Sequence, residues 1–287
     1  MKKILITGAT GNIGFEVIRF LYKNGTTNKI VAAVRNVDKA RNTFKEFLQL
    51  EFAEFDFEIP DLAEKALENV DCVFLLRPPH LSDIEIFRPL VAKMKENGIS
   101  EVVFLSVQGA EKSKVIPHNK IEKLIKDVGL NYIFLRPSYF MQNLTTTLIG
   151  DLHAKKQIIL PAGDAKFNWV DIENIAEAAS ITLDKFEMYK NEAIEITGSE
   201  NENFETVTKL LSKTLDKKIE FVNANPFRFY RIKKKEGMAK GMILVMIMLH
   251  FLPRFQKEPV ISNYYEKLTG KKPTKLIEFI KREKKKF

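Results

Sequence analysis

A short glycine-rich segment near the start of the chain has the residue types of a phosphate-binding turn. Gly8, Gly11 and Gly14 are spaced G-x-x-G-x-x-G between an expected strand, Lys3–Thr7, and an expected helix that starts near Asn12. The first glycine permits a tight turn, the second lets a pyrophosphate approach the backbone, and the third lets the helix pack closely on the strand. The free N–H groups and partial positive charge of a helix N-terminus favour an anion. The segment predicts a dinucleotide site made by Gly8, Thr10, Gly11, Asn12, Ile13 and Gly14.

The residue after the second expected strand, Lys29–Val34, bears on the choice of cofactor. Proteins that select NAD usually have an acidic residue here for the ribose hydroxyl, whereas those that select NADP use a basic one. This chain has Arg35, and Asp38 follows one helical turn later. A charged hydrogen bond contributes about 1.5–3 kcal/mol, which is enough to set a preference. We therefore expect NADP(H) to be preferred over NAD(H); a plain surface arginine is the alternative.

Two later strand ends supply further candidate contacts to the cofactor. Asp56 ends the third strand, where a side chain can reach the adenine amino group, and a helix cap or turn former is the alternative. Leu76 and Arg77 end the fourth strand before Pro78 and Pro79, which stiffen the following loop. Arg77 is a candidate partner of the pyrophosphate, with a purely structural loop as the equal alternative.

These residues need a parallel sheet to bring the strand ends to one edge. Through residue 137, short β-branched runs alternate with segments whose apolar residues have helical spacing. Parallel neighbours need a crossover of about a dozen residues or more, so this alternation predicts an α/β fold with a Rossmann-type, doubly wound parallel sheet. The expected strands are Lys3–Thr7, Lys29–Val34, Leu50–Phe55, Cys72–Leu76, Val102–Ser106 and Tyr132–Leu135.

After Pro137 the alternation breaks. A helix at about Ile172–Asp184 and a strand near Ala193–Ile196 still fit the sheet, and the remainder reads as mainly helical with prolines as breakers. We expect an NAD(P)-binding domain over residues 1–150. A smaller, mainly helical substrate lobe is expected over residues 151–287, interwoven with the last elements of the sheet.

Charge is distributed unevenly along the 287 residues. The total is +9, but residues 228–287 contain 17 Lys and Arg against five Glu, a net +12, which leaves −3 for the rest. Solvated helix faces are the plain interpretation, and weak contact with an anionic membrane surface is the sharper one. The methionine-rich segment Met238–Leu252 fits either a lid over a flat hydrophobic substrate or an interfacial helix. No zinc-finger spacing or RNA-binding signature is present, so we do not expect a nucleic-acid partner.

Cysteine usage and hydropathy indicate the compartment. Cys72 is the single cysteine, which excludes a disulfide framework. The longest apolar run, Met242–Leu249, is far shorter than the about 20 residues of a membrane span, and no signal peptide is visible. We expect a cytoplasmic monomer or homodimer. His80, His153 and His250 lack ligand-spaced carboxylate or cysteine partners, so no metal site is expected.

Several segments, in this order, resemble the NmrA-like branch of the atypical short-chain dehydrogenases/reductases. The branch includes bacterial NAD(P)H:quinone reductases, plant isoflavone reductases and non-catalytic redox sensors. The resemblance spans nearly the whole chain and implies a Rossmann domain with a small substrate lobe. The segments are Gly8–Gly14, Leu75–Pro79, Ser106–Ala110, Pro117–Glu122, Leu135–Asn143, Val170–Ile172 and Leu268–Pro273.

The resemblance leaves the chemistry open, because the Tyr-x-x-x-Lys dyad of the wider superfamily is absent. If Glu122 is aligned with the glutamate that often follows that lysine, His118 replaces the lysine and Lys114 the tyrosine. Quinones are good hydride acceptors, so a modest proton donor suffices for them. We expect NADPH-dependent reduction of a quinone or similar conjugated carbonyl, a small hydrophobic substrate. A sensor that binds NADP(H) without turnover is the alternative, and an epimerase, isomerase or dehydratase is disfavoured by the missing tyrosine.

The candidate catalytic groups are two side chains near the expected nicotinamide. His118 titrates near neutrality and lies four residues before Glu122 on one helical face, so we expect that carboxylate to orient it. A half-buried histidine with a local ion pair is the alternative. Ser106 could supply a hydroxyl at the end of its strand. The candidate substrate contacts are Tyr139, Phe140 and Asn143, with core packing as their alternative.

Overall fold

The computed structural model describes residues 1–114 and 116–287, which form two compact units. Residues 138–150, which the sequence analysis placed with the first domain, lie in the second unit, and the chain later returns to the first unit twice. The first unit comprises Met1–Pro137, Ile172–Ile196 and Tyr264–Lys271, and the second comprises Ser138–Asp171, Thr197–Asn263 and Lys272–Phe287.

The first unit is built on a seven-stranded sheet whose neighbours all pair in parallel, in the order β10-β6-β5-β4-β1-β2-β3. The chain runs outward from β1 in one direction and then from β4 in the other, so the order reverses between these two strands. Ligands of open α/β sheets bind at such a reversal. The doubly wound fold is thus confirmed. The strands are β1 (Lys3–Ile6), β2 (Lys29–Val34), β3 (Glu51–Glu54), β4 (Cys72–Leu76), β5 (Glu101–Leu105), β6 (Asn131–Pro137) and β10 (Glu192–Ile196).

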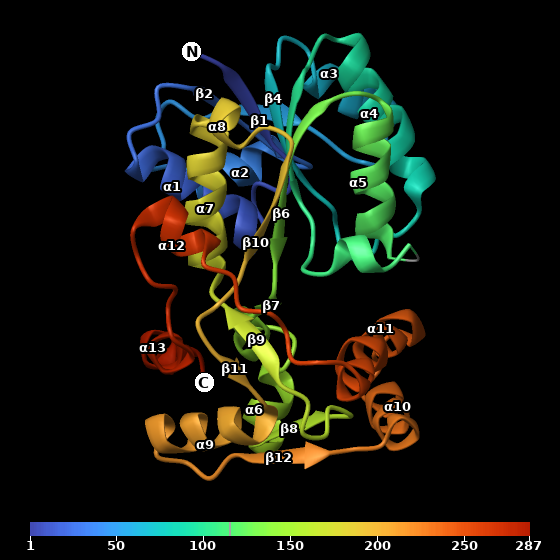
Figure 1. The fold of residues 1–287 in the computed structure, drawn as a ribbon, viewed down its shortest axis with the longest axis vertical. Coiled ribbons are helices and arrows are strands. Elements are labelled where there is room, and N and C mark those ends of the chain that lie inside the picture. Colours follow the sequence, from blue (N-terminus) through green and yellow to red (C-terminus); the bar gives the residue numbers. More distant parts are fainter. Residues whose placement is uncertain (115) are drawn as a thin grey trace. The chain divides into compact units, whose positions relative to one another are not determined.

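Helices cover both faces of this sheet: α1 and α7 pack together on one face, and α3, α4 and α5 cover the other (Figure 1). Buried small residues of α7, such as Ala176, Ala179 and Ser180, let it approach its neighbours closely. The helices of this unit are α1 (Asn12–Lys23), α2 (Val37–Thr43), α3 (Pro60–Ala66), α4 (Phe87–Glu96), α5 (Pro117–Asp127), α7 (Ile172–Asp184), α8 (Phe186–Tyr189) and α12 (Tyr264–Thr269).

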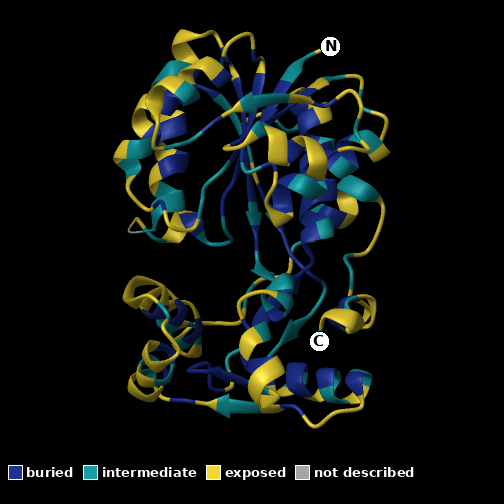
Figure 2. Cartoon of the chain, turned by 180° about the vertical axis from the view of Figure 1, so that it is seen from behind, coloured by how far each residue is buried: buried dark blue, intermediate teal, exposed yellow. Residues whose placement is uncertain are grey.

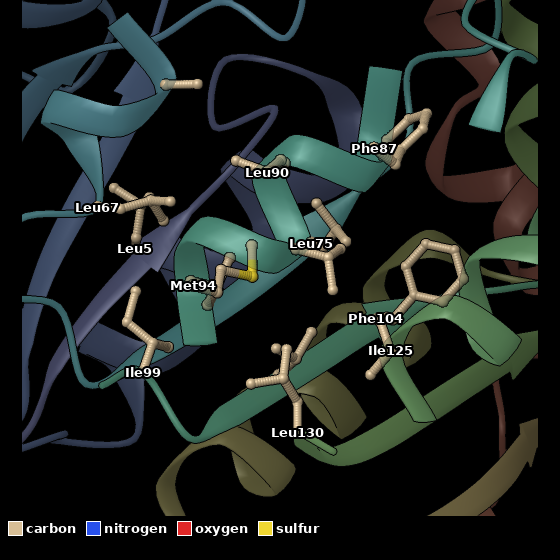
Figure 3. Packing of buried hydrophobic residues seen from close by; sticks show 14 of the residues in the cluster. Leu5, Leu67, Leu75, Phe87, Leu90, Met94, Ile99, Phe104, Ile125 and Leu130 are labelled. Atoms are coloured by element: carbon tan, nitrogen blue, oxygen red, sulfur yellow. The ribbon is translucent and has the colours of Figure 1, made fainter. Parts of the chain in front are cut away.

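The core of the first unit explains why its strands read as continuous apolar runs. In β4, the side chains from Cys72 to Leu75 are all fully buried, as expected for a parallel sheet with helices on both faces. Leu75 and Phe104 of the sheet pack with Leu90 and Met94 of α4 (Figure 3). Burial raises the pKa of the Cys72 thiol, so this cysteine packs in the core and does not act as a nucleophile.

The second unit combines two small sheets with helices. Its core contains Trp169, Phe204, Phe229 and Phe279, and the outer sides of its helices are exposed (Figure 2). Among the residues described, no helix is long and apolar enough to cross a bilayer. One sheet has β11 (Asn201–Glu202), β9 (Phe167–Val170) and β7 (Tyr139–Phe140), and the other has β12 (Glu220–Asn223) and β8 (Gln157–Leu160). The helices are α6 (Ile149–Lys155), α9 (Phe204–Leu215), α10 (Pro226–Lys235), α11 (Lys240–Phe251) and α13 (Leu276–Arg282).

The contact between α1 and the end of β1 leaves no room for a side chain. A Cβ at Gly14 would lie 2.3 Å from the carbonyl oxygen of Gly8 and 2.8 Å from the Cα of Ala9. Gly8 itself has a φ of +61°, the left-handed region that glycine adopts without strain. The predicted roles of these two glycines, a tight turn and close helix–strand packing, therefore have a direct steric basis.

We expect Gly14→Ala to lower the free energy of unfolding by about 1–3 kcal/mol, because the added methyl group forces α1 away from the turn. Urea denaturation measures this loss. Gly150→Ala is the matched control, since Gly150 lies in α6 with nothing near its would-be Cβ. That substitution should stabilise the chain by up to about 1 kcal/mol. Equal effects of the two substitutions would contradict the steric argument.

Candidate functional site

The glycine turn presents an open helix N-terminus. The Gly11 N–H donates to the Gly8 carbonyl oxygen at 2.9 Å, which closes the turn, and Gly11 has an extended backbone just before α1 begins at Asn12. Thr10, Gly11 and Asn12 are exposed, whereas Ile13 is buried in the core. The first turn of α1 contains no acidic residue. Its N–H groups have no partner within the helix, so the turn can accept an anion.

Thr7 joins the turn to the neighbouring strand end. Its hydroxyl donates to the Phe74 carbonyl oxygen at 3.1 Å and accepts from the Leu76 N–H at 2.8 Å. The Leu76 side chain lies 3.2 Å from where a Cβ of Gly8 would be. Sequence reasoning missed Thr7, because a threonine at the end of a strand gives no signal beyond β propensity. It fixes the ends of β1 and β4 where the sheet order reverses.

Arg35 is exposed at the end of β2 and, among the residues described, forms no ion pair. The next residue, Asn36, caps α2 by accepting from the Lys39 N–H at 2.8 Å. Asp56 forms a turn before α3, because its carboxylate accepts from the Glu58 N–H at 2.9 Å. The turn-forming alternative for Asp56 is thus what the structure shows, and its contact with adenine stays a prediction.

Taken together, these residues fit a dinucleotide. A Cβ at Gly11 would lie 3.1 Å from the Gly8 carbonyl oxygen, which is closer than most Cβ contacts, so a side chain there would crowd the turn. The helix N-terminus is exposed and free of acidic residues. Arg35, for which the described residues offer no carboxylate partner, follows the end of β2. Among the residues described, no group of His, Cys, Asp and Glu is arranged to hold a metal.

Arg77 holds the loop after β4 together. Its Nη1 donates to the carbonyl oxygens of Pro78, Pro79 and Leu81 at 2.9, 3.2 and 2.6 Å. Its Nε points to Nε2 of His118, 3.5 Å away. The structure therefore gives Arg77 the loop-bracing role, and its contact with a pyrophosphate stays a prediction.

His118 is neutral in this setting. It is half-buried at the start of α5, and its ring lies against Phe104 with centroids 6.1 Å apart. Burial, and secondarily the adjacent Arg77 guanidinium, lower the pKa of His118 to about 3. Since Nε2 accepts from Arg77, the single proton of the neutral ring lies on Nδ1.

The expected pairing of Glu122 with His118 was wrong. Glu122 is 3% exposed, and its carboxylate accepts from Ser106 Oγ at 2.5 Å and from Nε and Nη2 of Arg136 at 3.0 and 2.6 Å. Arg136 also pairs with Glu111 at 2.8 Å. The Arg136 guanidinium, which lies in β6, makes a bidentate ion pair with both oxygens of the buried Glu122 carboxylate. This pair is stronger than the expected i,i+4 contact with His118.

Ser106 is held in the same buried cluster. Its side chain is 2% exposed and its proton is donated to Glu122. The hydroxyl therefore supports the ends of β5 and β6, and we assign it no proton transfer. The sequence offered no signal for the Glu122–Arg136 pair, since the two residues lie in different elements 14 positions apart.

The predicted substrate contacts lie in the second unit. The Tyr139 ring packs edge-on against Trp169, with centroids 4.9 Å apart. The Tyr139 hydroxyl lies 2.9 Å from Nε2 of His250, whose Nδ1 lies 2.7 Å from the Met246 carbonyl oxygen. The core-packing alternative is thus realised for the Tyr139 ring. Phe140 and Asn143 are half-buried.

Comparison with known proteins identifies the family. The NmrA-like family matches residues 1–280, and the chain belongs to this family. Prestalk A differentiation protein A of Dictyostelium discoideum is 30% identical over 281 residues, covering 97% of this chain and 91% of that protein. An NAD(P)H azoreductase of Xenophilus azovorans is 26% identical over 282 residues, covering 97% and 96%.

A solved structure has the same fold. It is an NADPH-dependent quinone oxidoreductase of Escherichia coli in complex with NADPH, and it superposes with a TM-score of 0.87 at 23% identity. The superposition covers 97% of this chain and 99% of that one. The resemblance inferred from the ordered motifs is therefore confirmed at the level of the family and the fold.

The buried Glu122–Arg136 pair predicts a large loss of stability when one partner is removed. We expect Arg136→Met to lower the free energy of unfolding by about 3–5 kcal/mol, because it leaves a buried carboxylate uncompensated. Chemical denaturation measures the loss. Arg88→Met is the control, since it breaks the exposed pair with Glu85 and should leave stability unchanged. A similarly small effect at Arg136 would contradict the assignment of a stabilising buried pair.

Proposed function

We propose that the chain is an NADPH-dependent reductase that acts on a quinone or a similar conjugated carbonyl. The observation that carries the proposal is the open, acid-free N-terminus of α1 behind a turn that only glycine fits. Two relatives support the reductase class: the azoreductase and the quinone oxidoreductase. In this proposal the substrate is small and hydrophobic.

The cofactor would be held mainly by backbone. The N–H groups of Asn12 and Ile13 would bind the diphosphate, and the helix dipole favours its negative charge. Arg35 would bind the phosphate that distinguishes NADPH from NADH. NADPH held there would supply a hydride to the substrate. The chain's own residues have to orient the acceptor and provide a proton.

We assign the proton donor to His118. Its neutral ring carries a proton on Nδ1, while Arg77 occupies Nε2 and fixes the ring. A neutral imidazole N–H is a weak acid, which suits an acceptor such as a quinone whose reduction needs little acid assistance. Tyr139, Phe140 and Asn143 are proposed to line the substrate side.

A sensor that binds NADP(H) without turnover is the second candidate. Two observations favour it. The position expected for the dyad lysine holds a neutral, half-buried histidine. The Ser106 proton is already donated to Glu122. Such a protein would bind the cofactor and consume none.

The two candidates are separated by NADPH oxidation measured against a panel of quinones and enals. We expect steady NADPH consumption that depends on an added quinone. Tight NADPH binding by calorimetry, with no consumption for any acceptor, would instead support the sensor. Failure to bind NADPH at all would defeat both.

Arg35→Ala tests the cofactor preference. We expect NADPH affinity to fall by about ten- to hundredfold, the worth of one charged hydrogen bond, while NADH affinity is unchanged. Calorimetric titration with each cofactor measures this. Lys45→Ala is the control, because it removes an exposed cation of the first unit that does not follow β2. Equal losses for NADPH and NADH would remove Arg35 from the phosphate site.

His118→Ala tests the proton donor. We expect quinone turnover to fall at least about tenfold, with NADPH affinity intact, and His118→Gln to recover part of the rate because its amide keeps a donor. Since the pKa of His118 is about 3, the histidine stays neutral as the pH falls from 8 to 5, and the kcat/KM of the parent should show no inflection from it. An inflection near pH 6.5 that vanishes in the variant would show that His118 titrates in the active protein.

A further inference from the structure

Helix α11 exposes a continuous apolar face. Ile243, Met246 and His250 turn inward and are buried in the second unit. The opposite side, which we name the α11 face, consists of Leu244, Val245, Met248, Leu249 and Leu252, each between 44% and 50% exposed. An apolar face of this kind on a protein surface marks a site of interaction.

Exposed cations lie on the neighbouring helix α10 and at both ends of α11. Helix α10 packs beside α11, and its exposed Arg228, Arg231, Lys234 and Lys235 line an open hollow of about 800 Å³ together with Phe227. Further exposed cations are Lys240, Arg254 and Lys257.

These cations have no carboxylate partners. Residues 226–257 contain a single acidic residue, Glu236, and it binds Lys155 and Lys233. Within the described part of the chain, none of the seven exposed cations of this segment forms an ion pair. The segment therefore combines an apolar face with uncompensated positive charge.

We propose that residues 226–257 dock on a bilayer surface that contains anionic phospholipids. The α11 face enters the boundary between headgroups and acyl chains, and the surrounding Lys and Arg contact lipid phosphates, as in interfacial helices with basic flanks. Two other occupants fit less well. A second copy of this chain would bring two sets of like charges together, and a neutral small molecule would provide no negative charge for the cations. The inference goes beyond the proposed reductase function, which requires no membrane.

The test is sedimentation of the full-length chain with vesicles, without cofactor or substrate. We expect binding to vesicles of phosphatidylcholine mixed with phosphatidylserine, weakening as salt is raised, and little binding to phosphatidylcholine alone. Arg231→Glu/Lys234→Glu should lower the partition coefficient between vesicles and buffer at least about tenfold. Leu244→Ser/Leu249→Ser should weaken it by a similar factor, because it removes apolar insertion.

Matched controls keep the result interpretable. Lys213→Glu/Lys217→Glu makes the same charge change on the exposed side of α9 and its end, and Leu48→Ser/Met188→Ser replaces two exposed apolar residues of the first unit. Both should bind like the parent. Each variant is first checked for an unchanged melting temperature.

Three outcomes would overturn the proposal. The first is recovery in the supernatant at low salt with anionic vesicles. The second is a concentration-dependent dimer in sedimentation velocity that Leu244→Ser/Leu249→Ser abolishes, which would make the α11 face a self-association surface. The third is loss of vesicle-free quinone turnover in that variant, which would make it a substrate wall. The first two outcomes are measured without turnover, so they are independent of whether the chain proves to be a reductase, and the third applies only if the parent chain turns over a quinone.

Discussion

The closest backbone approach at the candidate site is between α1 and the end of β1, and the site depends on it. Gly14 faces the Gly8 carbonyl oxygen and Ala9 with no space for a methyl group. This contact fixes where α1 begins, and with it the direction of the helix N-terminus. The rest of α1 then packs along α7, whose small buried residues allow the approach. The steric constraint at Gly14 thus sets the position of the helix N-terminus that would bind the anion.

Two buried polar contacts hold the neighbouring strand ends in place. The Thr7 hydroxyl bridges β1 and β4, and the Glu122 carboxylate joins Ser106 after β5 to Arg136 in β6. Every polar atom in these contacts has a partner, which is the condition under which buried polar groups are tolerated. These contacts link the carboxyl ends of neighbouring strands beside the glycine turn.

The fold could be predicted well from the sequence. Strands buried in a parallel sheet have continuous apolar runs, such as Cys72–Leu75, and these alternate with segments of helical spacing. Contacts could be predicted less well. The i,i+4 rule paired Glu122 with His118, and only the three-dimensional structure brings Arg136 to that carboxylate. Asp56 illustrates the same limit: its position allowed both a contact with the ligand and a turn, and the structure shows one carboxylate oxygen accepting from the Glu58 N–H in a local turn. Local sequence patterns do not show which side chain from a distant part of the chain will hydrogen-bond to a given carboxylate.

The absence of the Tyr-x-x-x-Lys dyad changes the role of the cation beside His118, the proposed proton donor. In the dyad, the lysine charge lowers the pKa of the tyrosine and so favours loss of its proton. Here the nearby cation is Arg77, which disfavours the charged form of His118 and accompanies a burial that acts in the same direction. The result is a donor that stays neutral over the physiological range. Under the proposed function, such a donor would limit the chain to acceptors that take a hydride readily, and quinones and related conjugated carbonyls would be preferred over simple ketones.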